Sequence, residues 1–151
     1  GLLPPIEFLP YLHASVLEVR FGDWVIATAL QQASVWLSAG ERIPISVNIS
    51  ARHLLTDTFY EQLLQAIAGY PEVAAELLEL EITESIGDVE RRILEEISRE
   101  IVGDGYCLSF DDFGAQYSNL SILSSLQLSE LKIDKSIIND LAIKPNTLIK
   151  R

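Results

Sequence analysis

The sequence predicts an α/β fold, because strand-like and helix-like segments alternate along the chain at spacings of about 20 to 33 residues. Parallel strands need connections of a dozen or more residues, and the helix-like segments supply that length. The four predicted strands suit either a doubly wound open sheet or half of a (β/α)₈ barrel. With 151 residues, 48% of them hydrophobic, the chain is long enough for a single globular domain over residues 1–151.

Two helices are predicted before the first strand. Residues 4–15 form a short helix with proline at its start, a favoured position. Asp23 is suited to cap a longer helix that extends to about Leu37, because apolar residues recur there three and four positions apart. Gly40 ends this helix, and residues 44–50 then form the first strand.

The rest of the chain alternates helix and strand. The clearest helix ends near Gly103, and one of its ridges is entirely apolar, formed by Val89, Ile93, Ile97 and Ile101. Glycine, proline and polar residues bound the other segments. In order, we predict a helix at 56–70, a strand at 77–85, the helix just described, a strand at 106–112, a short helix near 118–126 and a strand at 130–134.

Polar side chains fall on one face of all four predicted strands. Successive side chains of a strand point to opposite faces, so each strand divides into two parities. One parity is bulky and apolar, with Val47 and Ile49, Leu80 and Ile82, Leu108 and Phe110, and Leu131 and Ile133. The other carries Ser46 and Asn48, Glu79 and Glu81, Ser109 and Asp111, and Lys132 and Asp134. Helices cover both faces of a doubly wound sheet, so a polar face favours the barrel, whose inner face holds catalytic side chains.

Two adjacent aspartates, Asp111 and Asp112, end the third strand. Carboxylates about 4 Å apart repel by roughly 4 kcal/mol at an effective dielectric constant near 20, so this pair needs compensation by solvent or by a cation. Strand ends often carry polar residues simply because they reach solvent. An amide, three carboxylates and a lysine on four neighbouring strand ends nevertheless suit a two-metal phosphodiester site.

Composition excludes several classes of function. With a net charge of −11, the chain lacks the basic surface that binding of DNA or RNA polymers requires. Binding of a nucleotide whose charge is neutralised by metal ions remains compatible with this net charge. The single Cys107 indicates a reducing compartment, and the isolated His13 and His53 do not form a zinc motif. The sequence contains no apolar run of 18 residues, so the chain is expected to lie in the cytoplasm. A parent protein can still be anchored in a membrane.

Other residues are expected to have ordinary structural roles. Trp24, Trp36 and Phe59 lie in helical patterns and are predicted to belong to the core. His53 is expected to be exposed in a loop, and Cys107 to be a small buried residue.

Four segments carry a resemblance to a known family, namely SVNISAR at 46–52, LELEITES at 78–85, FDDFG with YSNLS at 110–121, and LKIDKSII at 131–138. In this order and spacing they resemble the EAL domain, the cyclic di-GMP phosphodiesterase of bacterial signalling. The similarity extends over essentially the whole chain. It implies a (β/α)₈ barrel of which about four central βα units are present here.

The resemblance also implies roles for individual residues. Lys132 would lie beside the attacking water, and Glu84 would tether the loop that follows Asp112. The product would be the linear dinucleotide pGpG. The implied ligands of two Mg²⁺ or Mn²⁺ ions are Asn48, Glu81, Asp111 and Asp112.

Two departures from the family pattern leave an alternative open. Gln116 stands where the family usually has glycine, and the motif that names the family would precede Gly1, while later glutamates would follow Arg151. The chain is therefore expected to be an inactive part of an active parent domain. The alternative is a non-catalytic EAL module that binds cyclic di-GMP or a partner protein. Expected partners are GGDEF or sensor domains in the parent protein, and a second copy through the open strand edges.

Overall fold

The computed structural model describes residues 3–12, 15–83, 91–113 and 126–143. In chain order its elements are α1 (Pro5–Leu12), α2 (Leu17–Ser38), β1 (Ile45–Ile49), α3 (Ala51–Leu54), α4 (Phe59–Ala68), the 3₁₀ helix η1 (Ala75–Leu77), β2 (Leu78–Thr83), α5 (Arg91–Gly103), β3 (Cys107–Phe113), β4 (Glu130–Ile133) and α7 (Lys135–Ile143). The predicted α/β class is confirmed, as is the position of every predicted strand. The helix predicted near 118–126 lies outside the described residues.

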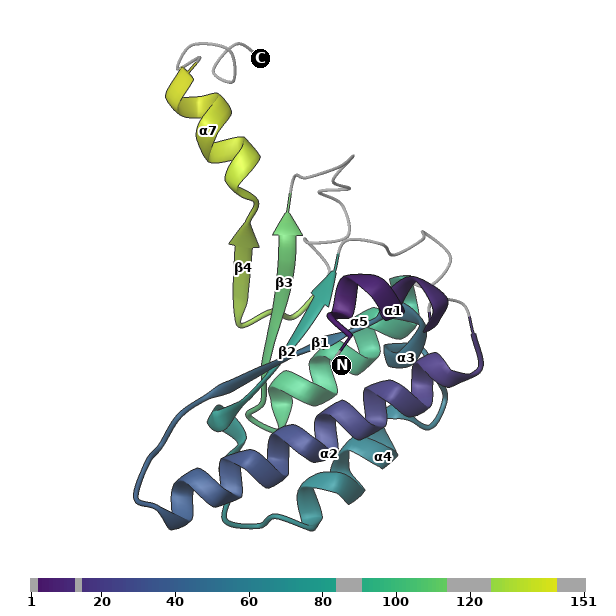
Figure 1. Cartoon of the computed structure of the whole chain (residues 1–151), viewed down its shortest axis with the longest axis vertical. Coiled ribbons are helices and arrows are strands. Elements are labelled where there is room, and N and C mark those ends of the chain that lie inside the picture. The colour runs from purple at the N-terminus through teal and green to yellow at the C-terminus, as the bar shows by residue number, and fades with distance from the viewer. Residues whose placement is uncertain (1–2, 13–14, 84–90, 114–125, 144–151) are drawn as a thin grey trace.

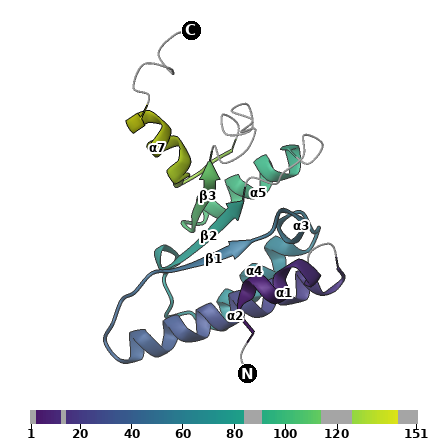
Figure 2. The same cartoon turned by 45° about the horizontal axis from the view of Figure 1, so that its top comes forward.

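Within the described part of the chain, four parallel strands form one sheet in the order β1-β2-β3-β4. Figures 1 and 2 show α1 to α5 on one side of this sheet, with α7 leading away from β4. The described crossover helices α4 and α5 thus cover the same face. In the part of the chain that the structure describes, helices cover a single face, which matches half of a barrel rather than a doubly wound sheet, whose helices cover both faces.

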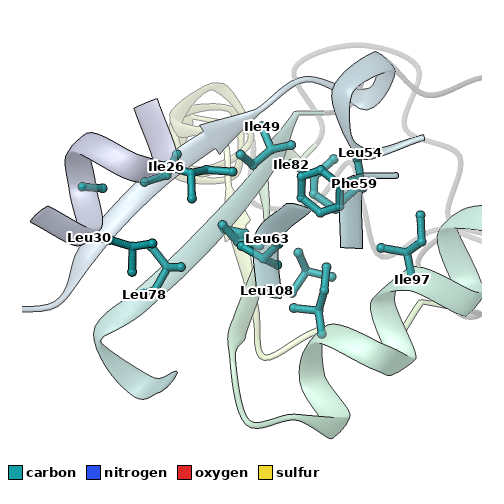
Figure 3. Close-up of a cluster of buried hydrophobic side chains, with 14 of the residues drawn as sticks. Ile26, Leu30, Ile49, Leu54, Phe59, Leu63, Leu78, Ile82, Ile97 and Leu108 are labelled. Atoms are coloured by element: carbon teal, nitrogen blue, oxygen red, sulfur yellow. The ribbon is translucent and has the colours of Figure 1, made fainter. Parts of the chain in front are cut away.

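The hydrophobic core fills the space between the sheet and its helices (Figure 3). The strands contribute the apolar parity that the sequence predicts: Val47, Ile49, Leu80, Ile82, Leu108 and Phe110 are all buried. The last strand is the exception, because Leu131 and Ile133 are 40% and 52% exposed. No described helix packs on this part of β4, since α7 projects away from it.

Several helix predictions need correction. α2 begins at Leu17, so Asp23 lies inside the helix and does not cap it. In α5 the buried apolar residues are Leu94, Ile97 and Ile101, whereas Ile93 is 45% exposed. Trp24 is also exposed, and its ring packs on Phe21 with centroids 5.8 Å apart. The segments α3 and α7 were not predicted.

His53 is buried, which contradicts the prediction of an exposed loop residue. It lies on α3, whose first turn is capped by the Ser50 hydroxyl accepting from the His53 backbone N–H. The His53 Nε2 atom lies 2.8 Å from an Asp23 carboxylate oxygen, and the ring packs edge-on against Phe59. These contacts fix α3, the segment directly after β1, to α2 and α4.

Gly22 leaves the space that the His53 ring occupies. A Cβ atom at this position would overlap the Nδ1 atom of His53. We therefore expect Gly22→Ala to lower the free energy of unfolding by about 1–3 kcal/mol, because a ring in a packed core can move only at the expense of its hydrogen bond. Denaturant titration of the purified chain measures this change.

Gly103→Ala is the matched control for this prediction. No atom lies within 4 Å of the Cβ that it would add, and Gly103 ends α5 with ordinary helical geometry. The control should be neutral or stabilising by up to about 1 kcal/mol. Equal stabilities for the two variants would contradict the packing of His53 against Gly22.

Within the described part of the chain, no helix combines the length and the hydropathy that a membrane-spanning segment needs.

Candidate functional site

The polar parity of the strands forms a row across the sheet. Asn48 on β1 pairs in register with Glu81 on β2, and Glu81 pairs with Ser109 on β3. Asp111 pairs with Thr83, one step closer to the carboxyl end of the sheet. Two residues along a strand span roughly 7 Å, so Asp111 lies in the layer above Glu81 on the same face. The backbone thus brings three of the predicted site residues to one face and one end of the sheet.

A register shift interrupts β3 where the two aspartates occur. Phe110 pairs with Leu131, but the next paired residues are Phe113 and Ile133. Two residues of β3, Asp111 and Asp112, therefore face the single residue Lys132 of β4, which is the pattern of a β-bulge. A bulge suspends the strict alternation of a strand, a change that the sequence pattern did not predict. The side chain of Asp112 and the whole of Glu84 lie outside the described part of the structure.

Lys132 binds two carboxylates of the polar row. Its Nζ atom donates to Oε1 of Glu81 and lies 2.9 Å from Oε1 of Glu79. Burial by itself lowers the pKa of Lys132, but the hydrogen bonds and charges of Glu81 and Glu79 outweigh it and raise this pKa above its ordinary value. Lys132 is therefore a permanent ammonium ion at neutral pH, held over the centre of the row.

Glu79 is the site residue to which sequence reasoning assigned no role. Its Oε2 atom accepts a hydrogen bond of 2.5 Å from the Ser46 hydroxyl on β1. Burial raises the pKa of Glu79, but the hydrogen bond from Ser46, the neighbouring Ser109 hydroxyl and the Lys132 ammonium group together lower it to about 2. Glu79 is thus an ionised carboxylate at neutral pH. Its place on the polar parity was the only signal in the sequence.

A cavity of about 300 Å³ adjoins the end of β1. It is lined by residues of α1, α2 and α3 and by Asn48, which is exposed. A larger cavity of about 430 Å³ lies between α2 and α4 and has no residue of the polar row in its lining. Of these two cavities, the one beside Asn48 shares a residue with the polar row.

The donor atoms of the row suit a hard divalent cation. Carboxylate and amide oxygens are the ligands that Mg²⁺ and Mn²⁺ prefer, and the described residues offer them from Asn48, Glu81 and Asp111. Among the described side chains, no three His, Cys, Asp or Glu groups are gathered closely enough to hold an ion. Lys132 binds Glu81 instead. By donor type and by face, these residues fit a metal site whose cation would replace the ammonium group at Glu81.

Comparison with known proteins identifies close relatives of this chain. A family model described as the EAL domain matches residues 1–149. The bifunctional diguanylate cyclase/cyclic di-GMP phosphodiesterase MucR of Pseudomonas aeruginosa is 37% identical over 147 residues. The cyclic di-GMP phosphodiesterase PdeR of Escherichia coli is 31% identical over 147 residues. The solved structure of the MucR phosphodiesterase with c-di-GMP superposes with a TM-score of 0.80 at 36% identity.

The chain is much shorter than these relatives. The matches cover 94% and 96% of this chain but only 21% of MucR and 22% of PdeR. In the MucR structure the match covers 94% of this chain and 57% of the solved chain. The four-stranded sheet therefore corresponds to part of a larger barrel-like domain.

Proposed function

Because this chain belongs to the EAL domain family, we propose that its parent domain hydrolyses cyclic di-GMP to linear pGpG. Residues 1–151 would form part of that single barrel domain. The row of Asn48 and Glu81 on adjacent strands, with Lys132 bound to Glu81, carries this proposal. It combines oxygen ligands with a permanent cation at the carboxyl ends of parallel strands, where barrel enzymes bind their substrates.

Four residues are proposed to hold two Mg²⁺ or Mn²⁺ ions: Asn48, Glu81, Asp111 and Asp112. When bound, such ions neutralise charge on the phosphate and activate a water molecule. The β-bulge supports the inclusion of both aspartates, because strict alternation would otherwise assign adjacent positions to opposite faces. Glu84 is proposed to hold the loop that follows β3.

Lys132 is proposed to act on the substrate directly. A divalent cation at Glu81 would compete with the Lys132 ammonium for the same carboxylate oxygen. Lys132 would then donate hydrogen bonds to the anionic phosphate or to the attacking water, which stabilises the charge that develops in the reaction. Asp111 and Asp112 would keep their negative charge to bind the ions.

The direct test is the reaction of the parent domain with cyclic di-GMP in the presence of Mn²⁺ or Mg²⁺, followed by chromatography. We expect pGpG to accumulate, and we expect a chelator to stop its formation because oxygen ligands do not retain these ions against it. Binding of cyclic di-GMP without formation of pGpG would overturn the enzyme proposal and establish the non-catalytic module.

The relatives support a regulatory setting for the parent protein. MucR is named as both a cyclase and a phosphodiesterase, and a further relative that is 38% identical is named as the oxygen sensor protein DosP. We propose that a GGDEF or sensor domain accompanies this domain in the parent protein. We also propose that the domain of this chain acts in the cytoplasm, where the single Cys107 stays reduced. Pairing with a second copy, or with the rest of the domain, stays a prediction based on β1 and β4, the two edge strands of the sheet as far as the structure describes it.

A further inference from the structure

We propose that Glu79 is the positioning residue for Lys132: it holds the Lys132 ammonium group over the polar row when Glu81 binds a metal ion instead. The kinetic consequence of this inference rests on the proposed phosphodiesterase function. The contact between Glu79 and Lys132 is present in the chain whatever its activity. The two glutamates of β2 would then have different roles: Glu81 binds metal, and Glu79 keeps Lys132 in place.

The geometry requires a bridge across an intervening strand. Lys132 lies on β4 and Glu79 on β2, and β3 runs between them. Two strand spacings amount to about 10 Å, and Lys132 also lies nearer the carboxyl end of the sheet than Glu79, so the lysine and glutamate side chains must extend toward each other. Between these two positions β3 carries Ser109, which pairs with Glu81 and has a small, fully buried side chain. The result is the 2.9 Å contact between Nζ of Lys132 and Oε1 of Glu79.

Glu79 is held from its other side as well. Its Oε2 atom accepts the hydrogen bond from Ser46 on β1, while Oε1 binds Lys132. The carboxylate is therefore fixed between the first and last strands of the described sheet. The side chains of Glu79 and Lys132 are 19% and 28% exposed, so solvent screens this pair less than an ion pair on an open surface. A carboxylate anchored in this way can keep an ammonium group in position without help from Glu81.

Kinetics of the parent protein provide the first readout, with Glu79→Gln as the variant. It keeps the size of the side chain and removes the charge. We expect kcat to fall about tenfold with little change in KM, as for other residues that orient a group at a metal site. In a Lys132→Met background the same substitution should cause no further loss, because the group that it positions is absent. An additive loss in the double variant would overturn the proposal.

Chemical labelling of lysines provides a readout that needs no activity. The parent protein is treated with a limiting amount of acetic anhydride, with and without Mg²⁺, and acetylation of each lysine is quantified by peptide mass spectrometry. With Mg²⁺ present, Glu79→Gln should raise acetylation of Lys132 about fivefold, because the ammonium group loses its charged partner. Exposed Lys135 is the internal reference and should not change.

Two further variants make the experiment decisive. Glu76→Gln removes a carboxylate that pairs with Arg42 at 2.9 Å, so acetylation of Lys132 and kcat should stay near the wild-type values. If Glu79→Gln fails to fold, Ser46→Ala releases the other oxygen of Glu79 and should raise Lys132 acetylation by a smaller factor. Unchanged acetylation of Lys132 in a folded variant overturns the positioning role. Absence of pGpG from the wild-type protein instead overturns the proposed function and leaves the labelling result valid.

Discussion

Glu81→Gln should reduce hydrolysis of cyclic di-GMP by the parent domain at least about 100-fold, which corresponds to about 3 kcal/mol of lost transition-state stabilisation. Glu81 is 8% exposed and stands in register with Asn48 at the centre of the polar row. The amide has the same shape as the carboxylate but no charge. It therefore weakens the attraction for a divalent cation, whose affinity depends on the number of charged ligands.

The measurement is the initial rate of pGpG formation over a range of Mg²⁺ and substrate concentrations. Raising Mg²⁺ should restore part of the rate if Glu81 acts by holding the ion. Glu41→Gln, an identical change of an exposed residue in the turn before β1, should leave the rate within about twofold. A rate near the wild-type value for Glu81→Gln would remove this residue from the set of proposed ligands.

The largest effect on stability is expected for Phe59→Ala, with a loss of about 3–5 kcal/mol in the free energy of unfolding. Phe59 is 1% exposed at the start of α4, and its ring meets the ring of His53 edge-on at a centroid distance of 5.0 Å. Removing the ring leaves a cavity and exposes the buried His53 to an unfilled space. The contacts between α3, α4 and the sheet would be weakened together.

Tyr11→Ala is the matched control, because it also removes an aromatic ring but from a side chain that is 83% exposed on α1. Its effect should stay within about 0.5 kcal/mol. Denaturant titrations of both variants, analysed with a common slope, give the comparison. A loss below about 1 kcal/mol for Phe59→Ala would show that α4 does not pack against the sheet as described.

Strand patterns in the sequence predicted most of the fold and the face of the candidate site. The alternation of apolar and polar residues placed Val47 and Leu80 in the core and Asn48 and Glu81 on the other face, as the structure confirms. Such patterns are informative because the period of a strand is two residues, and a sheet buried on one face must match it. The helix predictions were less exact. Val16, the residue before α2, has no side chain that can cap the helix, and α3 is only four residues long.

The sequence by itself determined the α/β class, the polar face of the sheet and the resemblance to the EAL domain, which the family comparison then confirmed. Only the tertiary structure decided that His53 is buried against Asp23, that a bulge interrupts β3 at Asp111, and that Lys132 binds two glutamates. The reason is the range of each interaction. Periodicity acts over a few residues, whereas His53 and Asp23 are 30 positions apart and Lys132 and Glu81 are 51 apart. Contacts of that range form only when the strands have paired and the helices have packed on them.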